Sequence, residues 1–256
     1  MDNLKTYLNF FKRNYKKDYI TYAITVIIIS LILVGFTIWT SKVSLAPEMS
    51  FAYSISGLNL IFLFVMGILW GSKDFAGAMT IRSDRKSYFK SMIIFSIISI
   101  IVMCMLDMFI IGISNFIIKI FTDNVKIKSM TTVNFDGFVL NDLTKNLSIV
   151  QLYMLNAIRI FTTMMFGTFL GSFAYRLRKV TAVIIYVGVP TLTVALLAKI
   201  AMVSDIVNKI INLIYSIGEN FYTLSIFYIV LSIVFIALSY LCLRKAPIGE
   251  YAHDWL

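Results

Sequence analysis

Six long apolar segments dominate this chain and leave few folds open to it. A helix that crosses the hydrocarbon core of a bilayer needs roughly twenty apolar residues. Segments of this kind occur at residues 20–40, 51–71, 91–118, 150–173, 181–203 and 221–243. A backbone that faces lipid must also satisfy its own hydrogen bonds. We therefore expect an all-α membrane protein whose six transmembrane helices form one domain over residues 19–243.

The composition excludes a soluble protein. Of the 256 residues, 59% are hydrophobic and only 14% are charged, whereas soluble domains carry about 25% charged residues. The net charge is +10, which in a soluble protein would suggest nucleic acid as a partner. Here the basic residues lie mainly at the ends of the apolar segments, where anionic lipid headgroups attract them. We expect membrane lipid as a partner, and no nucleic acid.

The lysine and arginine residues are distributed unevenly between the two sides. If the N-terminus lies inside the cell, the inner segments contain fifteen of these residues and the outer segments contain six. Inner loops of membrane proteins are enriched in lysine and arginine. Both termini are therefore predicted to be cytoplasmic, and residues 244–256 form a cytoplasmic tail. Residues 119–149 and 204–220 are predicted to be external, and the apolar spacing of the second indicates a short amphipathic helix.

The first eighteen residues are too polar to cross a membrane. Tyr7, Phe11 and Tyr15 recur at helical spacing, while Lys5 and Lys12 occupy other faces. This pattern is typical of an amphipathic helix that lies in the membrane interface with its lysines toward anionic headgroups. A basic lead-in that only fixes the orientation of the first span is the simpler alternative. We expect a cytoplasmic interfacial helix over residues 1–18.

Motifs for catalysis, nucleotide binding or metal binding are missing from the sequence. There is no G-x-x-x-x-G-K-[ST] loop for nucleotide phosphates, no H-E-x-x-H pair for zinc and no G-x-S-x-G turn for a serine nucleophile. Cys104 and Cys242 both fall within apolar segments, and the only histidine is His253. Two thiols and one imidazole make no metal cluster. We expect no catalytic residue, no bound cofactor and no metal in this chain, which is not an enzyme on its own.

Two charged residues lie deep within the apolar segments. Asp107 precedes the external end of the third segment and Arg159 follows the external start of the fourth, so both are expected at a similar depth. Ionised groups inside a membrane are rare and are usually paired or functional. We predict that they form an intramembrane charge pair or face a common polar cavity. In the fifth segment, Gly188 and Pro190 predict a kink that acts either as a hinge or as static packing.

The fourth segment also carries a small-residue motif. Gly167 and Gly171 are spaced as G-x-x-x-G, a pattern that permits two membrane helices to approach closely. Small residues are common in such helices, so the motif alone predicts little.

The cytoplasmic loop over residues 72–90 is longer than a connection between two spans requires. Five of its residues are basic, and Phe75, Ala78 and Met79 share one face of a short amphipathic helix. A turn follows, in which Ser83 or Asp84 is suited to cap the start of the third span. A solvated loop whose charges only set topology is the alternative.

The chain resembles the membrane subunits of ABC-2-type ATP-binding-cassette exporters of Gram-positive type. These subunits have six spans, cytoplasmic termini and an interfacial N-terminal helix. Their first cytoplasmic loop carries an acidic residue, a Gly-Thr-like element, a basic turn and a lysine that opens the third span. The corresponding residues here are Asp74, Gly77 to Thr80, Arg82 to Arg85 and Lys90. Asp74 replaces the commoner glutamate, and the proline often found in the basic turn is absent.

The resemblance implies a type V exporter-like fold in the bacterial cytoplasmic membrane. It also implies a permease that pairs with a second permease copy or paralogue and with a separate ABC ATPase, which binds ATP and magnesium. The substrate would be amphipathic or hydrophobic, such as a toxin or antimicrobial peptide or a lipid-like molecule. The residues expected to couple the ATPase to the spans are Asp74, Phe75, Ala78, Met79, Arg82, Asp84 and Arg85. The alternatives are a secondary transporter or channel, and a non-transporting membrane scaffold or sensor subunit.

Overall fold

The structure is a bundle of long helices, and every element within its described residues is a helix. The computed structural model describes residues 2–43, 55–81, 84–121, 148–177 and 220–246. The predicted fifth span with Gly188 and Pro190 lies outside these ranges, as do most of the two external segments and Arg82. The helices are α1 (Asp2–Val43), α2 (Ile55–Gly71), α3 (Lys73–Ile81), α4 (Arg85–Phe121), α6 (Ile149–Arg176) and α10 (Phe221–Arg244).

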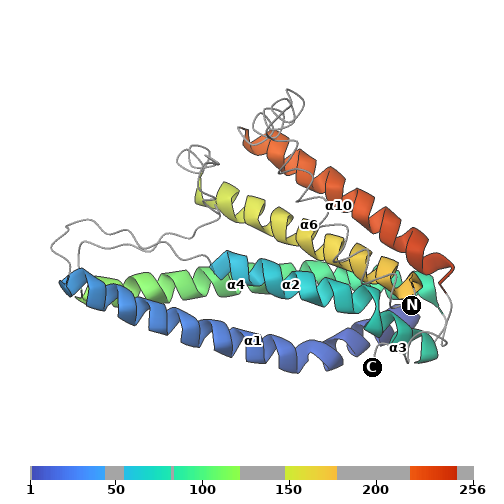
Figure 1. The fold of residues 1–256 in the computed structure, drawn as a ribbon, viewed down its shortest axis with the longest axis horizontal. Helices are drawn as coiled ribbons and strands as arrows, with labels where there is room; N and C mark the ends of the chain where they lie inside the picture. Colours follow the sequence, from blue (N-terminus) through green and yellow to red (C-terminus); the bar gives the residue numbers. More distant parts are fainter. Residues whose placement is uncertain (1, 44–54, 82–83, 122–147, 178–219, 247–256) are drawn as a thin grey trace, which may run out of the picture.

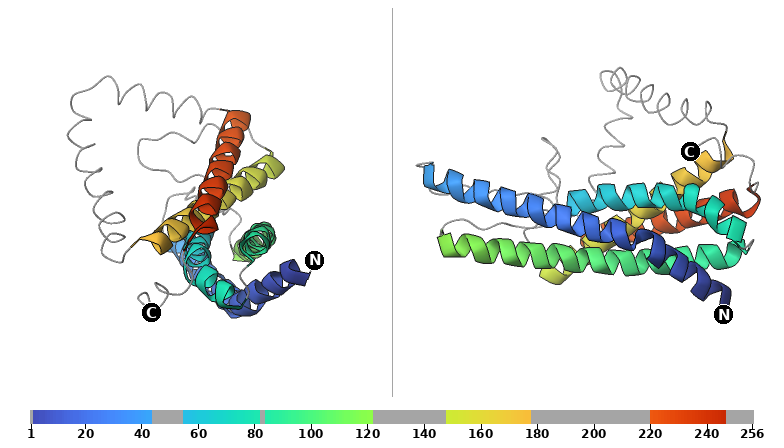
Figure 2. Two further views of the ribbon diagram at one scale, coloured as in Figure 1. Left: turned by 90° about the vertical axis from the view of Figure 1, so that its right-hand side faces the viewer. Right: turned by 90° about the horizontal axis from the view of Figure 1, so that it is seen from below.

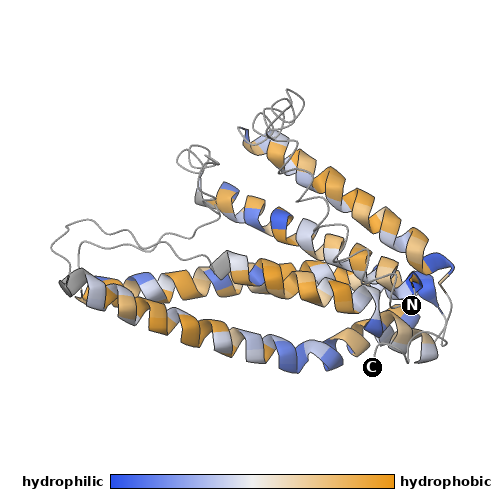
Figure 3. Cartoon of the chain, viewed as in Figure 1, coloured by the Kyte–Doolittle hydropathy of each residue, from blue (hydrophilic) through white to orange (hydrophobic). Residues whose placement is uncertain are grey.

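Five helical stretches in the described residues are long and apolar enough to cross a membrane. They are Asn3–Thr40, Gly57–Thr80, Arg85–Phe121, Val150–Arg176 and Phe221–Arg244. Each contains most of one predicted span, which supports a multi-pass membrane protein. Their side chains agree with this assignment, because many large apolar residues on the outside of α1, α4 and α10 are exposed, such as Trp39 at 60% and Phe116 at 68%. Figure 3 shows the apolar character of these helices along most of their length.

One end of the bundle gathers the basic segments of the sequence. The N-terminal turns of α1, all of α3, the start of α4 and the last turns of α6 and α10 meet there, and we name this region the basic end (Figure 1). Hydrogen bonds join its parts, such as the one from Asn3 Nδ2 to Asp84 Oδ2 at 3.2 Å. The chain therefore alternates in direction between α1, α2, α4 and α6 as the charge distribution predicts. From the basic end, α6 and α10 diverge from α1 and α4 toward the opposite end (Figure 1).

Among the described helices, α2 and α6 approach each other closely, and glycines on both helices make this possible. The backbone of Gly67 and Gly71 lies against α6 near Thr168 and Ser172. In return, the backbone of Gly167 and Gly171 lies against the carbonyl groups of α2. Without side chains at these positions, two membrane helices can pack backbone against backbone. The G-x-x-x-G pattern in the fourth span therefore marks a real interface, and α2 carries a second copy of it.

The face of α10 that packs on α6 is built from small polar residues. Ser225, Ser232 and Ser239 recur every seven residues and are buried. Ser232 Oγ lies 2.8 Å from Thr162 Oγ1 on α6, and Ser232 and Ser239 also donate to carbonyls one turn earlier in α10. Such bonds satisfy a hydroxyl where lipid offers no partner. The α6–α10 contact therefore satisfies the hydroxyls of Ser232 and Ser239, whereas Ser225 Oγ has no hydrogen-bond partner among the described residues.

The first eighteen residues differ from the prediction, because they do not form a separate interfacial helix. They are the beginning of α1, which continues without a break to Val43, although its first turns slant away from the rest (Figure 2). Their apolar face is where the sequence places it: Tyr7, Phe11 and Tyr15 are buried. That face packs on the protein rather than on lipid. The ring of Phe11 lies 5.1 Å from that of Trp70 and 5.4 Å from that of Tyr88, which anchors α1 to α2 and α4.

Candidate functional site

The helix α3 is held firmly between α2 and α4 at the basic end. Ser72 separates it from α2 by a single residue, and the Ser72 hydroxyl donates to the carbonyl of Ile68 at 2.6 Å. The Tyr88 hydroxyl donates to the carbonyl of Trp70 at 2.7 Å. Both bonds satisfy carbonyls that the end of α2 leaves without helical partners. The short helix predicted within the 72–90 loop is confirmed as α3, and it follows directly on the end of α2 that these bonds hold.

The apolar residues of α3 point into this chain. Phe75 and Ala78 have no exposed surface, and Met79 is 4% exposed. The ring of Phe75 packs edge-on against Tyr88 of α4 and Tyr175 of α6, at centroid distances of 5.5 and 5.4 Å. Phe75 and Met79, which the sequence predicts to anchor a partner, are thus buried within this chain. Phe75 fastens α3 to its own bundle, because its ring contacts α4 and α6.

Asp74 is also turned inward. It lies in the first turn of α3, is 9% exposed, and its carboxylate accepts a hydrogen bond from the Tyr15 hydroxyl of α1. This bond ties α3 to the N-terminal part of α1. Among the residues of α3 whose burial the structure describes, Lys73 and Thr80 are exposed. Both residues are polar, and Arg82 lies outside the described residues.

Asp84 and Arg85 connect the start of α4 to other elements. Asp84 caps α4, because its carboxylate accepts from the backbone N–H of Ser87 at 3.3 Å and from the Ser87 hydroxyl at 2.5 Å. These hydrogen bonds lower the pKa of Asp84 below its ordinary value. The prediction of a cap at Ser83 or Asp84 is thus confirmed at Asp84.

The Arg85 side chain reaches the last turn of α10. Its guanidinium donates to the carbonyls of Leu243, Arg244 and Ala246 at 3.1, 2.6 and 2.8 Å. These carbonyls lie at the negative end of the α10 dipole, which favours a cation there. Arg85 therefore clamps the end of α10 to the start of α4.

A second candidate site lies inside the membrane-spanning part of the bundle, around Asp107. This α4 residue has no exposed surface. Its carboxylate interacts electrostatically with Tyr22 of α1 and with Tyr153 and Arg159 of α6. The structure thus brings Asp107 and Arg159 into one polar region, as the sequence predicts. Neither oxygen of Asp107 accepts a hydrogen bond from any residue within the described ranges. Asp107 and Arg159 therefore do not form a hydrogen-bonded pair.

Two asparagines that sequence reasoning missed complete this region. Asn59 of α2 has no exposed surface and accepts from the Tyr22 hydroxyl at 2.7 Å. Asn156 of α6 is 1% exposed and accepts from Arg159 Nη2 at 3.0 Å. A signal was present, since both interrupt apolar segments and Asn156 precedes Arg159 by three residues, on the same helix face. We name the following six residues the Asp107 cluster: Tyr22, Asn59, Asp107, Tyr153, Asn156 and Arg159.

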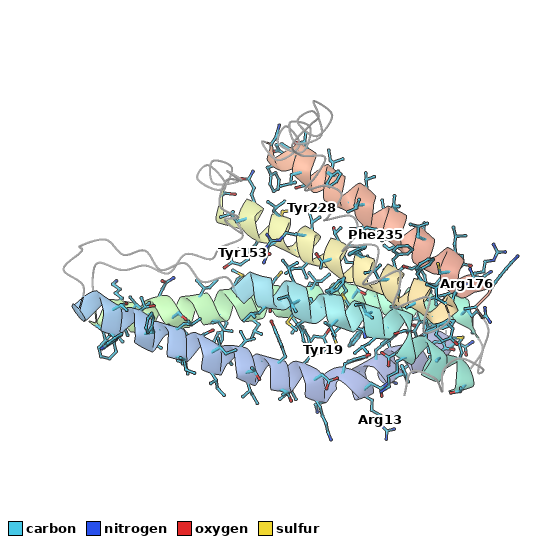
Figure 4. The ribbon with its side chains drawn as sticks, in the orientation of Figure 1. Arg13, Tyr19, Tyr153, Arg176, Tyr228 and Phe235 are labelled. Carbon is cyan, nitrogen blue, oxygen red and sulfur yellow. The ribbon has the colours of Figure 1, made fainter. Side chains whose placement is uncertain are left out.

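The Asp107 cluster spans four helices in a part of the molecule that is otherwise apolar. Figure 3 shows hydrophilic bands on α6 between hydrophobic turns, and Figure 4 places Tyr153 on the same helix, with Tyr228 between α6 and α10. Tyr228 interacts electrostatically with Arg159. A charged residue at the centre of a membrane helix costs about 3 kcal/mol on insertion scales. A cost of this size, concentrated in one place, makes the Asp107 cluster a candidate functional site.

Other chemistry finds no support among the described residues. No group of three or more histidine, cysteine, aspartate or glutamate side chains there could hold a metal ion, and Cys104 and Cys242 are free thiols on different helices. Comparison with known proteins adds no identification: no family model, no curated protein and no solved structure matches this chain. Any function must therefore be argued from the two sites themselves.

Proposed function

We propose that this chain is the permease subunit of an ABC exporter in a bacterial cytoplasmic membrane. A separate ATPase subunit hydrolyses ATP, and two permease chains enclose the path of an amphipathic or hydrophobic substrate, with a peptide as the first candidate. The observation that carries the proposal is the position of α3. It is a short helix at the basic end, its apolar face is buried in its own bundle, and its polar residues Lys73 and Thr80 are exposed.

The contacts of α3 suit the transmission of force. The Phe75 ring touches α4 and α6, the Asp74 carboxylate is bonded to α1, and Arg85 carries the connection to α10. A push on α3 would therefore reach every long helix that the structure describes. Its exposed residues, Lys73 and Thr80, are available to a partner on the cytoplasmic side. In this proposal Asp74, Phe75, Ala78, Met79 and Arg85 act inside the permease, as the mechanical connection rather than the docking surface.

The proposal predicts a stoichiometric partner. When the chain is purified from its native membrane in mild detergent, a P-loop ATPase should accompany it in a fixed ratio. The ATPase should hydrolyse ATP faster when amphipathic peptides are added, because α3 would transmit substrate binding in the bundle to the ATPase. Mass spectrometry and a phosphate-release assay check both results. Purification of the chain alone, under conditions that preserve other membrane complexes, would argue against the proposal.

The Asp107 cluster favours a second candidate, a secondary transporter or channel. Such proteins place ionisable and polar residues near the middle of the membrane, and here four further polar residues join Asp107 and Arg159. Reconstituted liposomes separate the two candidates. Substrate movement that needs an ion gradient but no ATP would support the secondary transporter, whereas dependence on ATP and on the partner would support the exporter.

A further inference from the structure

We infer that the Asp107 cluster binds the amino-terminal end of a peptide substrate, where an ammonium group lies next to a carbonyl oxygen. This inference deepens the proposed function and rests on it for the choice of a peptide. The argument begins with the hydrogen-bonding groups that the bundle leaves unmatched. Both oxygens of Asp107 have no donor among the described residues, and Asn59 Nδ2 and Asn156 Nδ2 have no acceptor there.

These unmatched groups are buried in the bundle. Asp107 and Asn59 have no exposed surface, and Asn156 has 1%. Most buried polar groups in folded proteins are hydrogen-bonded, so each exception calls for an explanation. Three exceptions in one connected cluster are more simply explained by a common ligand than by three separate defects. The side-chain oxygens of both asparagines are already occupied, by Tyr22 and Arg159, which leaves their N–H groups to meet that ligand.

The unmatched groups define what the ligand must offer. The two Asp107 oxygens require N–H donors and favour a positive charge. The two asparagine amides require an oxygen acceptor. A ligand with only an amine would meet the electrostatic repulsion of Arg159, and a ligand with only a carboxylate would meet that of Asp107. An ammonium group with a neighbouring carbonyl oxygen satisfies both requirements, and every unmodified peptide carries this pair at its amino terminus.

The burial of the Asp107 cluster also determines when the ligand can bind. The cluster is formed by α1, α2, α4 and α6, so a peptide reaches it only after some of these helices separate. A bound amino terminus then stabilises the separated arrangement, because it supplies hydrogen bonds that the closed bundle does not make. The separation would move α4, whose first turn is hydrogen-bonded to the end of α10 through Arg85. The ligand site and the basic end are in this way connected by α4.

Two forms of one peptide test the inference. A synthetic amphipathic helical peptide with a fluorophore at its C-terminus is prepared with a free α-amino group and, separately, with an acetylated one. Binding to the full chain in lipid nanodiscs is measured by fluorescence anisotropy. Acetylation should weaken binding about tenfold or more, the loss expected for hydrogen bonds to a charged group. Asp107→Asn should weaken binding of the free form to the same extent and leave binding of the acetylated form unchanged.

A matched control and a test on the native chain keep the inference falsifiable. Asp18→Asn removes a carboxylate that is exposed on α1 and should bind both peptides as the wild type does. If Asp107→Asn does not fold, the comparison of the two peptides on the wild-type chain still tests the inference. Equal binding of the two forms by the wild type, or binding of neither, would overturn the inference. Absence of an ATPase partner would instead count against the proposed function, since this assay needs no ATPase.

Discussion

Replacing Gly171 with alanine is expected to destabilise the bundle by about 3 kcal/mol, the upper end of what overpacked interfaces show. A β-carbon at this position would overlap the carbonyl oxygen of Ile68 on α2. The obstacle is backbone, which cannot rotate away as a flexible side chain can, so α2 and α6 would have to move apart. The matching contacts at Gly67 and Gly71 would then loosen as well. Unfolding by SDS titration in mixed micelles measures the change.

Gly112→Ala is the matched control for this variant. Gly112 lies in α4, also a membrane-spanning helix, and a β-carbon there meets no atom within 4 Å. The unfolding free energy should therefore stay within about 0.5 kcal/mol of the wild type, as for substitutions away from buried features. If Gly171→Ala were as stable as Gly112→Ala, the close α2–α6 contact would not be what holds this pair together.

Replacing Phe75 with alanine is expected to cost about 3–5 kcal/mol of folding stability, the range for the loss of a buried aromatic side chain. The ring has no exposed surface and lies between Tyr88 and Tyr175, so its removal leaves a cavity where α3, α4 and α6 meet. The sequence alone favours a different outcome, in which Phe75 contacts a partner and its truncation spares the bundle. Thermal unfolding of the purified chain in detergent distinguishes these two outcomes.

Lys73→Ala provides the comparison on the same helix. Lys73 is exposed, and its truncation should leave the unfolding temperature nearly unchanged. A Phe75→Ala variant that unfolds at the same temperature as Lys73→Ala would contradict the assignment of Phe75 to the interior of the chain. That result would return Phe75 to the docking surface.

Features that depend on apolar length could be predicted from the sequence. The span expected at residues 221–243 corresponds to α10 (Phe221–Arg244), and the span at 150–173 corresponds to α6 (Ile149–Arg176). The length of an apolar segment predicts a span because the thickness of the bilayer sets how many apolar residues a helix needs to cross it. The short helix within the 72–90 loop and the cap at Asp84 were also predictable, since capping is a local interaction between neighbouring residues.

Apart from the shared polar region of Asp107 and Arg159, features that depend on which helix faces which could not be predicted. The amphipathic face of residues 1–18 was visible, but periodicity does not tell whether a face meets lipid or protein. Phe11 meets Trp70 and Tyr88, which come from two other helices. The same limit applies to the Asp107 cluster, where Asn59 and Tyr22 are brought together from α2 and α1. Such contacts follow from tertiary packing and cannot be predicted from the spacing of residues within one segment.

In the proposed function, energy enters the chain from a partner ATPase through the exposed face of α3. The most direct measurement compares peptide-stimulated ATP hydrolysis in the purified complex of the wild type, Lys73→Glu and a control, Lys17→Glu, whose residue is exposed on α1. Reversing the charge at Lys73 should weaken binding of the ATPase about tenfold, about 1.4 kcal/mol, and abolish the stimulation. The control should behave as the wild type. Undiminished stimulation in Lys73→Glu would contradict the claim.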